Sequence, residues 1–200
     1  MPKKPFERKD RFYFKAKTEG YPARSAYKIM ELDDRFKIFK PRSTVIDLGC
    51  APGGWLKVGQ ERLGDKGTLV GIDLLPVKFS LAPYTHFLQG DFTVAENREW
   101  IKSKLPGGRA HWIISDMSPN ISGVKFRDGF QSYELVRLAL HFTSEHLRTG
   151  GGFLCKIFPS SELEDLRKEI KSHFEKLVTV IPEATRASST EVYLVALGKK

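Results

Sequence analysis

The sequence is poor in cysteine and has no long apolar run, and each shortage excludes a class of protein. Two cysteines in 200 residues exclude a disulfide framework, and neither has Cys or His neighbours at the spacing of a zinc site. No segment approaches the roughly 20 apolar residues of a membrane helix, and the basic start of the chain lacks the apolar region of a signal peptide. We therefore expect a cytoplasmic protein with no membrane span and no metal site.

The chain does have enough apolar surface for a hydrophobic core. Hydrophobic residues make up 40% of it and charged residues 28%, which excludes a disordered protein. A length of 200 residues lies at the upper end of one ordinary domain. We predict a single domain over 21–200, preceded by a basic N-terminal segment over 1–20.

Positive charge predominates and is concentrated near the N-terminus. Lys and Arg number 33 against 24 Asp and Glu, and residues 1–40 hold twelve basic and six acidic side chains, so +6 of the net +9 lies there. Aromatic residues are interleaved with these cations: Phe6, Phe12, Tyr13, Phe14 and Tyr21. The alternative is a solvated, partly disordered tail. We favour polyanion binding, because cations bind phosphates and aromatic rings stack on bases.

Short strand-like apolar runs alternate with helical patterns along the chain. Strands are predicted at 44–48, 68–73, 85–88, 111–115, 152–157, 177–181 and 191–197. Helices are predicted at 25–36, 54–63, 94–104, 129–147 and 161–174. This alternation predicts an α/β fold with a seven-stranded, mostly parallel sheet and helices on both faces.

The connection between the last two predicted strands, 182–190, has no helical pattern. We therefore expect the last strand to be antiparallel and to lie at or near the sheet edge. A doubly wound sheet that ends in an antiparallel strand is the Rossmann-like architecture of class I methyltransferases, an analogy at the level of the fold.

A glycine-rich turn follows the first predicted strand. The run Gly49-Cys50-Ala51-Pro52-Gly53-Gly54-Trp55 leads into a helix, and glycines at such a turn let the backbone approach a ligand. The fingerprint G-x-G-x-x-G is not met, which argues against an NAD-dependent dehydrogenase. We expect Trp55 at the mouth of the pocket, where its ring can pack against the ligand, and a core position is the alternative.

Three carboxylates are predicted at successive carboxyl ends of parallel strands: Asp47, Asp73 and Asp91. Each alone is typical of a helix cap or turn. Together on one edge they would repel a polyphosphate and favour a cationic nucleoside. S-adenosylmethionine, which carries a sulfonium, an ammonium and a ribose, matches that field, with Asp73 placed to accept the ribose hydroxyls.

Polar residues also stand at the ends of later strands. The fourth predicted strand ends in Ser115-Asp116-Met117-Ser118-Pro119-Asn120, and Lys156 lies in an otherwise apolar strand. A buried ammonium pairs with a carboxylate or loses its proton, and the alternative is a lysine that reaches solvent from the strand end. Lys28, on the predicted helix 25–36, and Glu191 would by default be surface residues.

These motifs resemble those of one family. The chain resembles the FtsJ/RrmJ (RlmE) family of ribose 2′-O-methyltransferases from about Tyr21 to Leu197. The segments that carry the resemblance, in the same order and with compatible spacing, are 47–55, 115–120, Lys156 and Glu191-Val192-Tyr193. Ser118 stands where many members have alanine, which is a slight departure.

The resemblance implies a tetrad for methyl transfer to a ribose 2′-hydroxyl, formed by Lys28, Asp116, Lys156 and Glu191. It also implies S-adenosylmethionine as the cofactor, with contacts at Gly53, Trp55, Asp73, Asp91 and Asp116. A lysine acts as a general base only when it is neutral, so Lys156 is either the base or a steering group.

The implied substrate is a uridine ribose in 23S ribosomal RNA of the large subunit, methylated by a monomer, and transfer RNA is the alternative. A phosphate track is expected from basic residues on loops near the site: Arg24, Lys125, Arg127 and Arg186. A non-catalytic RNA-binding relative would lack a tetrad residue, and all four are present.

Overall fold

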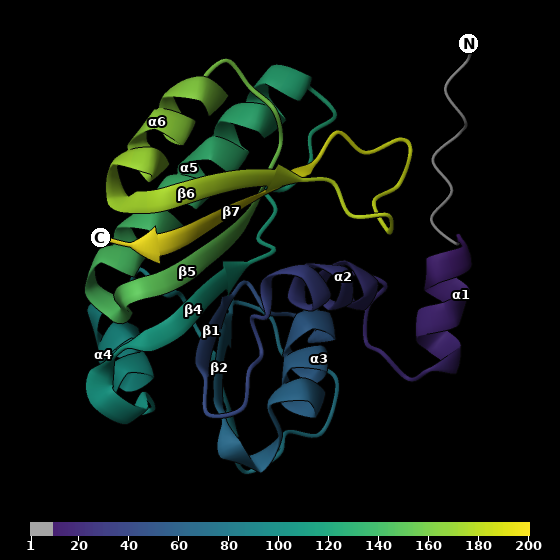
Figure 1. Ribbon diagram of the computed structural model, residues 1–200. Helices are drawn as coiled ribbons and strands as arrows, with labels where there is room; N and C mark the ends of the chain where they lie inside the picture. The colour runs from purple at the N-terminus through teal and green to yellow at the C-terminus, as the bar shows by residue number, and fades with distance from the viewer. Residues whose placement is uncertain (1–9) are drawn as a thin grey trace.

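The computed structural model describes residues 10–200, in which helices cover both faces of a seven-stranded sheet (Figure 1). The strands are β1 (Thr44–Leu48), β2 (Thr68–Asp73), β3 (Thr85–Gln89), β4 (Ala110–Ser115), β5 (Leu147–Ile157), β6 (Phe174–Val180) and β7 (Val192–Lys199). The α-helices are α1 (Arg11–Thr18), α2 (Ala26–Phe36), α3 (Gly54–Leu63), α4 (Ala95–Ser103), α5 (Lys125–His146) and α6 (Leu163–His173). Two short 3₁₀ turns, Gly64–Lys66 and Pro106–Gly108, precede β2 and β4.

The strand order is β3-β2-β1-β4-β5-β7-β6, and β7 is antiparallel to both of its neighbours. The other neighbouring strands pair in parallel. The predicted fold class is therefore confirmed, with the last strand next to the edge. The chain reverses its winding direction between β1 and β4, and in open α/β sheets this switch point is where ligands bind, beyond the carboxyl ends of the strands.

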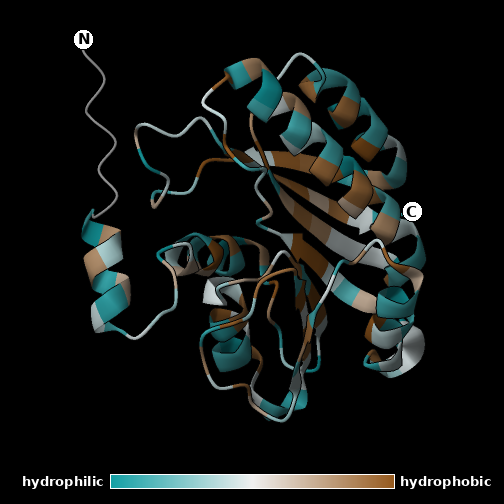
Figure 2. Cartoon of the chain, turned by 180° about the vertical axis from the view of Figure 1, so that it is seen from behind, coloured by the Kyte–Doolittle hydropathy of each residue, from teal (hydrophilic) through white to brown (hydrophobic). Residues whose placement is uncertain are grey.

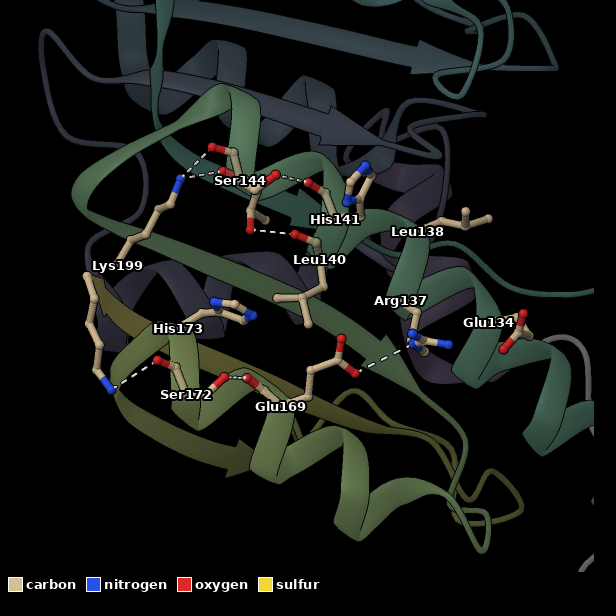
Figure 3. Close-up of a pocket in the computed structure, with 12 residues that line it drawn as sticks. Glu134, Arg137, Leu138, Leu140, His141, Ser144, Glu169, Ser172, His173 and Lys199 are labelled. Atoms are coloured by element: carbon tan, nitrogen blue, oxygen red, sulfur yellow. Dashed lines mark hydrogen bonds and ion pairs between the residues drawn. The ribbon is translucent and has the colours of Figure 1, made fainter.

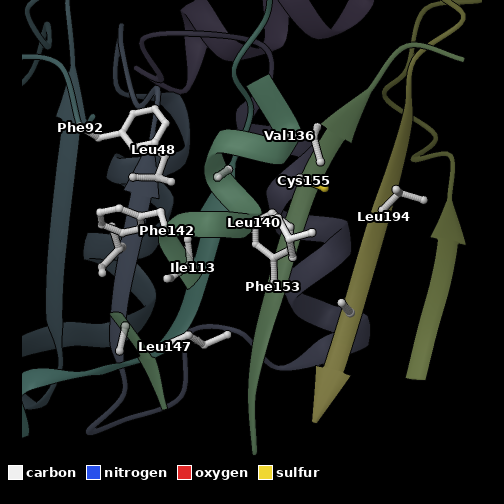
Figure 4. Close-up of a cluster of buried hydrophobic side chains, with 14 of the residues drawn as sticks. Leu48, Phe92, Ile113, Val136, Leu140, Phe142, Leu147, Phe153, Cys155 and Leu194 are labelled. Atoms are coloured by element: carbon white, nitrogen blue, oxygen red, sulfur yellow. The ribbon is translucent and has the colours of Figure 1, made fainter. Parts of the chain in front are cut away.

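Two hydrophobic clusters hold the layers together, one on each face of the sheet. The first packs Leu140 of α5 against strand residues such as Ile113 and Phe153 (Figure 4). Ile101 of α4 and Leu166 of α6 belong to the same cluster. The second packs α2 and α3 on the opposite face. Figure 2 shows the same division between a hydrophobic interior and a polar surface: the strands are largely brown (hydrophobic), and the helices carry teal (hydrophilic) along their outer sides.

Some boundaries differ from the prediction. Strand β5 begins at Leu147 rather than at 152, because Leu147 already pairs with Ala110 of β4, and the turn-like run 149–151 forms a bulge before Gly152 pairs with Trp112. Helix α5 begins at Lys125 rather than at 129. Helix α1 was not predicted; Asp10 caps it by accepting a hydrogen bond from the Tyr13 N–H at 3.0 Å.

Residues 10–20 are thus part of the folded protein, and Phe12 lies 5.4 Å from the ring of Tyr27 on α2. The prediction for Phe6 and the rest of 1–9 lies outside the described residues. Within residues 10–200, no helix combines the length and the apolar character needed to cross a bilayer.

Candidate active site

The four residues of the predicted tetrad come together at the carboxyl edge of the parallel strands. Lys28 projects from α2, Asp116 follows β4, Lys156 lies near the end of β5, and Glu191 precedes β7. Because β7 is antiparallel, its first residues lie at the edge where β4 and β5 end. The reversed strand is thus the reason that Glu191 reaches the same site.

The tetrad consists of two ion pairs. Lys28 donates to Glu191 Oε1, and both side chains are largely buried. Lys156 Nζ donates to the main-chain oxygen of Asp116 at 2.6 Å and lies 3.0 Å from Asp116 Oδ1. The lysine in the apolar strand therefore has a carboxylate partner instead of reaching solvent.

Tyr193 joins the two pairs, and the sequence analysis gave it no role. Its hydroxyl donates to Asp116 Oδ1 at 2.7 Å, the same oxygen that faces Lys156. Its ring centroid lies 5.6 Å from Lys28 Nζ. The sequence did contain a clue to this role. Side chains alternate between the two faces of a strand, so a tyrosine two residues after Glu191 faces the same side as Glu191, and a buried tyrosine hydroxyl needs a hydrogen-bond partner.

The electrostatics of the site keep Asp116 charged. Burial alone would raise the pKa of this carboxyl, but the positive charges of Lys156 and Lys28 and the hydrogen bond from Tyr193 hold it below its usual value. Burial, followed by the nearby carboxylates of Asp116 and Glu191, raises the pKa of Tyr193 well above its usual value. Tyr193 thus stays protonated and acts as a donor.

Backbone geometry explains two glycines in the turn after β1. Gly49 and Gly53 have φ of +75° and +109°, a region that favours glycine. A Cβ at Gly49 would overlap Met117 Cγ, and one at Gly53 would lie 2.5 Å from the ring of Phe79. The turn therefore approaches the segment after β4 more closely than any larger residue allows.

Two of the three predicted carboxylates lie at the sheet edge, where they also stabilise turns. Asp73 accepts main-chain hydrogen bonds from Ala51 and Leu75, both at 2.8 Å. Asp91 Oδ1 accepts from the N–H and the hydroxyl of Thr93. Each oxygen of Asp73 accepts one of these bonds, and Asp91 Oδ2 accepts none of them, so both carboxylates keep lone pairs for a ligand.

Asp47 lies one residue before the carboxyl end of β1, as expected, but it is enclosed and does not open onto the sheet edge. The residue is fully buried within β1, and neither carboxylate oxygen has a hydrogen-bond partner in the described part of the chain. Burial, with a smaller contribution from the charges of Asp116 and Asp73, raises its pKa well above the usual value. Strand β1 is covered on both faces, so even its penultimate residue is enclosed.

Trp55 also lies elsewhere than predicted. It is only 2% exposed, belongs to the core cluster under α2 and α3, and packs 5.8 Å from the ring of Tyr193. Its indole N–H donates to the Ser25 carbonyl at 3.0 Å. The alternative prediction, a core position for Trp55, is therefore the correct one for its ring, because the first turn of α3 directs the ring inward beneath α2.

A cavity of about 570 Å³ opens beside the tetrad. It is lined by Arg24, Ser25, Lys28, Ser118, Ile121, Lys125, Asp128, Phe158, Pro159, Arg186, Ser188, Ser189, Thr190 and Glu191. Arg24 and Arg186 both donate to the carboxylate of Asp10. Three residues of the predicted phosphate track, Arg24, Lys125 and Arg186, thus surround the cavity that contains the Lys28–Glu191 pair.

A second cavity, of about 470 Å³, lies between α5 and α6 at the opposite end of the sheet (Figure 3). There Lys199 donates to the carbonyls of Thr143, Ser144 and Leu147 at the end of α5. Its lining includes no tetrad residue. Among residues 10–200, no group of three or more His, Cys, Asp and Glu side chains is arranged to hold a metal ion.

The sheet order and the glycine turn at the switch point define a class I methyltransferase fold. Within that class, the FtsJ-like methyltransferase model matches residues 21–199, and the chain belongs to this family. The resemblance inferred from the motifs is thereby confirmed.

Individual relatives agree with this assignment. The chain is 44% identical over 189 residues to the ribosomal RNA large subunit methyltransferase E of Chromohalobacter salexigens, covering 94% of this chain and 89% of that protein. It is 42% identical over 200 residues to the protein of the same name from Methanocaldococcus jannaschii, covering 97% and 82%. The crystal structure of a ribosomal RNA methyltransferase from Plasmodium falciparum superimposes with a TM-score of 0.78 at 28% identity, covering 90% and 98%.

Proposed function

We propose that this protein transfers a methyl group from S-adenosylmethionine to the 2′-hydroxyl of a uridine ribose in 23S ribosomal RNA of the large subunit. The observation that carries the proposal is the convergence of Lys28, Asp116, Lys156 and Glu191 beside a cavity with a basic rim. Relatives named as large-subunit ribosomal RNA methyltransferases support this substrate. The proposal takes the enzyme to be a cytoplasmic monomer, with the methyltransferase domain at 21–200 and RNA contacts from the basic segment before it.

The residues around the glycine turn fit S-adenosylmethionine. The turn bends sharply at Gly53, whose φ is +109°. The buried carboxyl of Asp47 has no partner in the described part of the chain and is neutral, because burial raises its pKa well above the usual value, and the carboxylates of Asp73 and Asp116 lie near it. An acidic set of this kind suits a cationic ligand. The cofactor would be held by Gly53, the main chain of Trp55, Asp73, Asp91 and Asp116. When bound, it supplies an electrophilic methyl group on a sulfonium.

The chain's own groups then orient and deprotonate the ribose hydroxyl. The Lys28–Glu191 pair lines the cavity and positions the hydroxyl by hydrogen bonding. The main-chain oxygen and Oδ1 of Asp116 both lie next to Lys156 Nζ and hold it in place. Two of the three hydrogen-bonding directions around Nζ are thereby used, and the third is left for the ribose hydroxyl. In its neutral form Lys156 would accept the hydroxyl proton at Nζ and become an ammonium beside Asp116, while the oxygen would take the methyl group and leave the sulfur of the bound cofactor as a neutral thioether.

Radiolabelled methyl transfer tests the proposal. Large ribosomal subunits from a strain that lacks the modification, naked ribosomal RNA and transfer RNA are each incubated with the wild-type protein and with Lys156→Ala. We expect label in ribosomal RNA, recovered as an alkali-resistant dinucleotide and lost in the variant. Label in transfer RNA alone would keep the chemistry and refute the substrate, and no label in any RNA would refute the function.

A second variant separates the two roles of Lys156. Lys156→Arg keeps a cation beside Asp116, but a guanidinium does not lose its proton in proteins and so does not accept one. If Lys156 is the base, this variant is as inactive as Lys156→Ala. If it retains a substantial part of the activity, Lys156 is a steering group.

A further inference from the structure

Four apolar side chains are exposed in the segment just before α5 and in the first turns of that helix. They are Ile121, Val124, Phe126 and Phe130, with exposed fractions from 44% to 71%. Single exposed apolar residues are ordinary, but a contiguous group indicates a binding surface. We call residues 121–130 the lip, since Ile121 and Lys125 belong to the wall of the cavity that contains Lys28 and Glu191.

The lip is held in shape by one buried carboxylate. Asp128 Oδ1 accepts hydrogen bonds from the Ser122 N–H at 2.8 Å and its hydroxyl at 2.7 Å, and Oδ2 accepts from the Gly123 N–H at 3.0 Å. These three bonds fold the turn back onto the first turn of α5. Ile121 and Val124 flank the turn and remain outside it, at exposed fractions of 68% and 58%.

The lip is also fixed relative to the tetrad. Gly129 packs so closely on the segment after β5 that an added Cβ would lie 2.9 Å from Ser160 Cβ. Ser132 Oγ accepts a hydrogen bond from the Phe158 N–H at 3.0 Å. Phe158 is two residues beyond Lys156, so the lip and the reacting centre are connected through a short and well-packed part of the chain.

The charges around the lip indicate what covers it. Phe126 is 71% exposed and is flanked in sequence by the exposed cations Lys125 and Arg127. Arg24 and Arg186 line the same cavity. The cores of protein–protein interfaces are depleted in charged residues, lysine among them, whereas an exposed aromatic between cations is typical of single-stranded nucleic-acid sites.

We propose that the lip is a base-binding site, in which Phe126 stacks on a nucleobase next to the target ribose while Lys125 and Arg127 contact the flanking phosphates. The proposal rests on RNA being the substrate. A ribose that enters the cavity takes its nucleotide out of the helical stack, and an aromatic ring compensates the lost stacking in a sequence-tolerant way. The lip would then hold the strand while the tetrad acts.

Substitutions of Phe126 test the stacking. We expect Phe126→Ala to raise KM for the large subunit by roughly fivefold to a hundredfold, the range for loss of one stacked base. We expect kcat to change less than about twofold, because Phe126 is not a member of the tetrad. Phe126→Trp should keep the wild-type KM, and Phe126→Leu, apolar but without a ring, should resemble alanine. The matched control is Leu138→Ala, an exposed residue about three turns farther along α5.

Photocrosslinking provides a readout that does not depend on turnover. An RNA oligonucleotide carrying 5-iodouridine is irradiated with the wild-type protein, and the crosslinked peptide is sequenced. We expect the crosslink at Phe126, and its absence in Phe126→Ala. A lip that binds a ribosomal protein would show the KM effect on subunits but no crosslink to RNA, which would overturn the proposal, as would an unchanged KM in Phe126→Ala. Failure of the proposed function would appear separately, as the absence of methyl transfer by the wild-type protein.

Discussion

Replacing Lys156 by methionine should destabilise the fold as well as abolish activity. The Lys156 and Asp116 side chains are 8% and 18% exposed, and Nζ lies 3.0 Å from Oδ1. Removing one partner of such a pair leaves the other charge buried, which typically costs about 3–5 kcal/mol. We expect about 3 kcal/mol, at the lower end, because Tyr193 and Lys28 still face Asp116.

The double variant Lys156→Met/Asp116→Asn provides the comparison. It removes both charges and keeps an oxygen for the Tyr193 hydroxyl, so it should recover about 2 kcal/mol, since neutral replacements of buried pairs are often nearly neutral. Both variants should be inactive. Urea unfolding followed by circular dichroism measures the difference, and the single variant should melt about 6–12 °C below wild type.

The stability difference between the wild type and Lys156→Met should depend on pH. Asp116 has a lowered pKa in the folded state, so its contribution to stability is present above the unfolded pKa and is lost as the pH falls through the folded one. Without Lys156 the folded pKa rises, so protonation relieves the buried charge at a higher pH. The stability gap should therefore narrow as the pH falls from 7. A single variant as stable as wild type, or no recovery in the double variant, would refute this reasoning.

Three further predictions follow from packing, a helix end and thiol burial. Gly49→Ala should lower the free energy of unfolding by about 2–4 kcal/mol in urea titrations, because the new Cβ overlaps Met117 at a positive φ; an unchanged midpoint would show that the turn relaxes easily. Asp33→Ala should cost about 2–3 kcal/mol, since buried Asp33 accepts from the Phe39 N–H at 2.8 Å and pairs with an arginine, whereas Asp34→Ala, which removes an exposed carboxylate from the same arginine, should cost less than about 0.5 kcal/mol. Burial raises the pKa of both cysteine thiols, so neither should react with Ellman's reagent at pH 8 until the protein is unfolded, and rapid reaction of the native protein would contradict their burial.

Local sequence was sufficient for much of the fold. The bounds of β1, β2 and α3 agree with the predicted ranges because their apolar runs are closed by glycines and an aspartate. The connection 182–190 has no helical pattern, and this alone indicated that β7 pairs in the antiparallel direction with β6. At each of these places the turn residues and the hydrophobic periodicity predict the same secondary structure.

Side-chain direction was less predictable. Asp47 and Trp55 were both expected to act on a ligand, and both side chains are buried. Whether a residue near a strand or helix end faces a pocket depends on which helix covers it, and here α2 covers Trp55. Lys28 and Glu191 are 163 residues apart in sequence, and the motifs alone do not show that they pair with each other. Tyr193 could be assigned a partner only once β7 was placed beside β5.

The insertion of β7 between β5 and β6 couples the assembly of the sheet to the onset of activity. A chain in which only β1 to β5 have paired still lacks the register Lys156↔Tyr193, so Asp116 has not received the tyrosine hydroxyl and Lys28 has no Glu191. The Lys28–Glu191 contact joins residues 163 apart in sequence, and contacts between distant residues are slow to form. The docking of β7 therefore completes the core and the tetrad in the same event, and we expect a chain without docked β7 to be inactive.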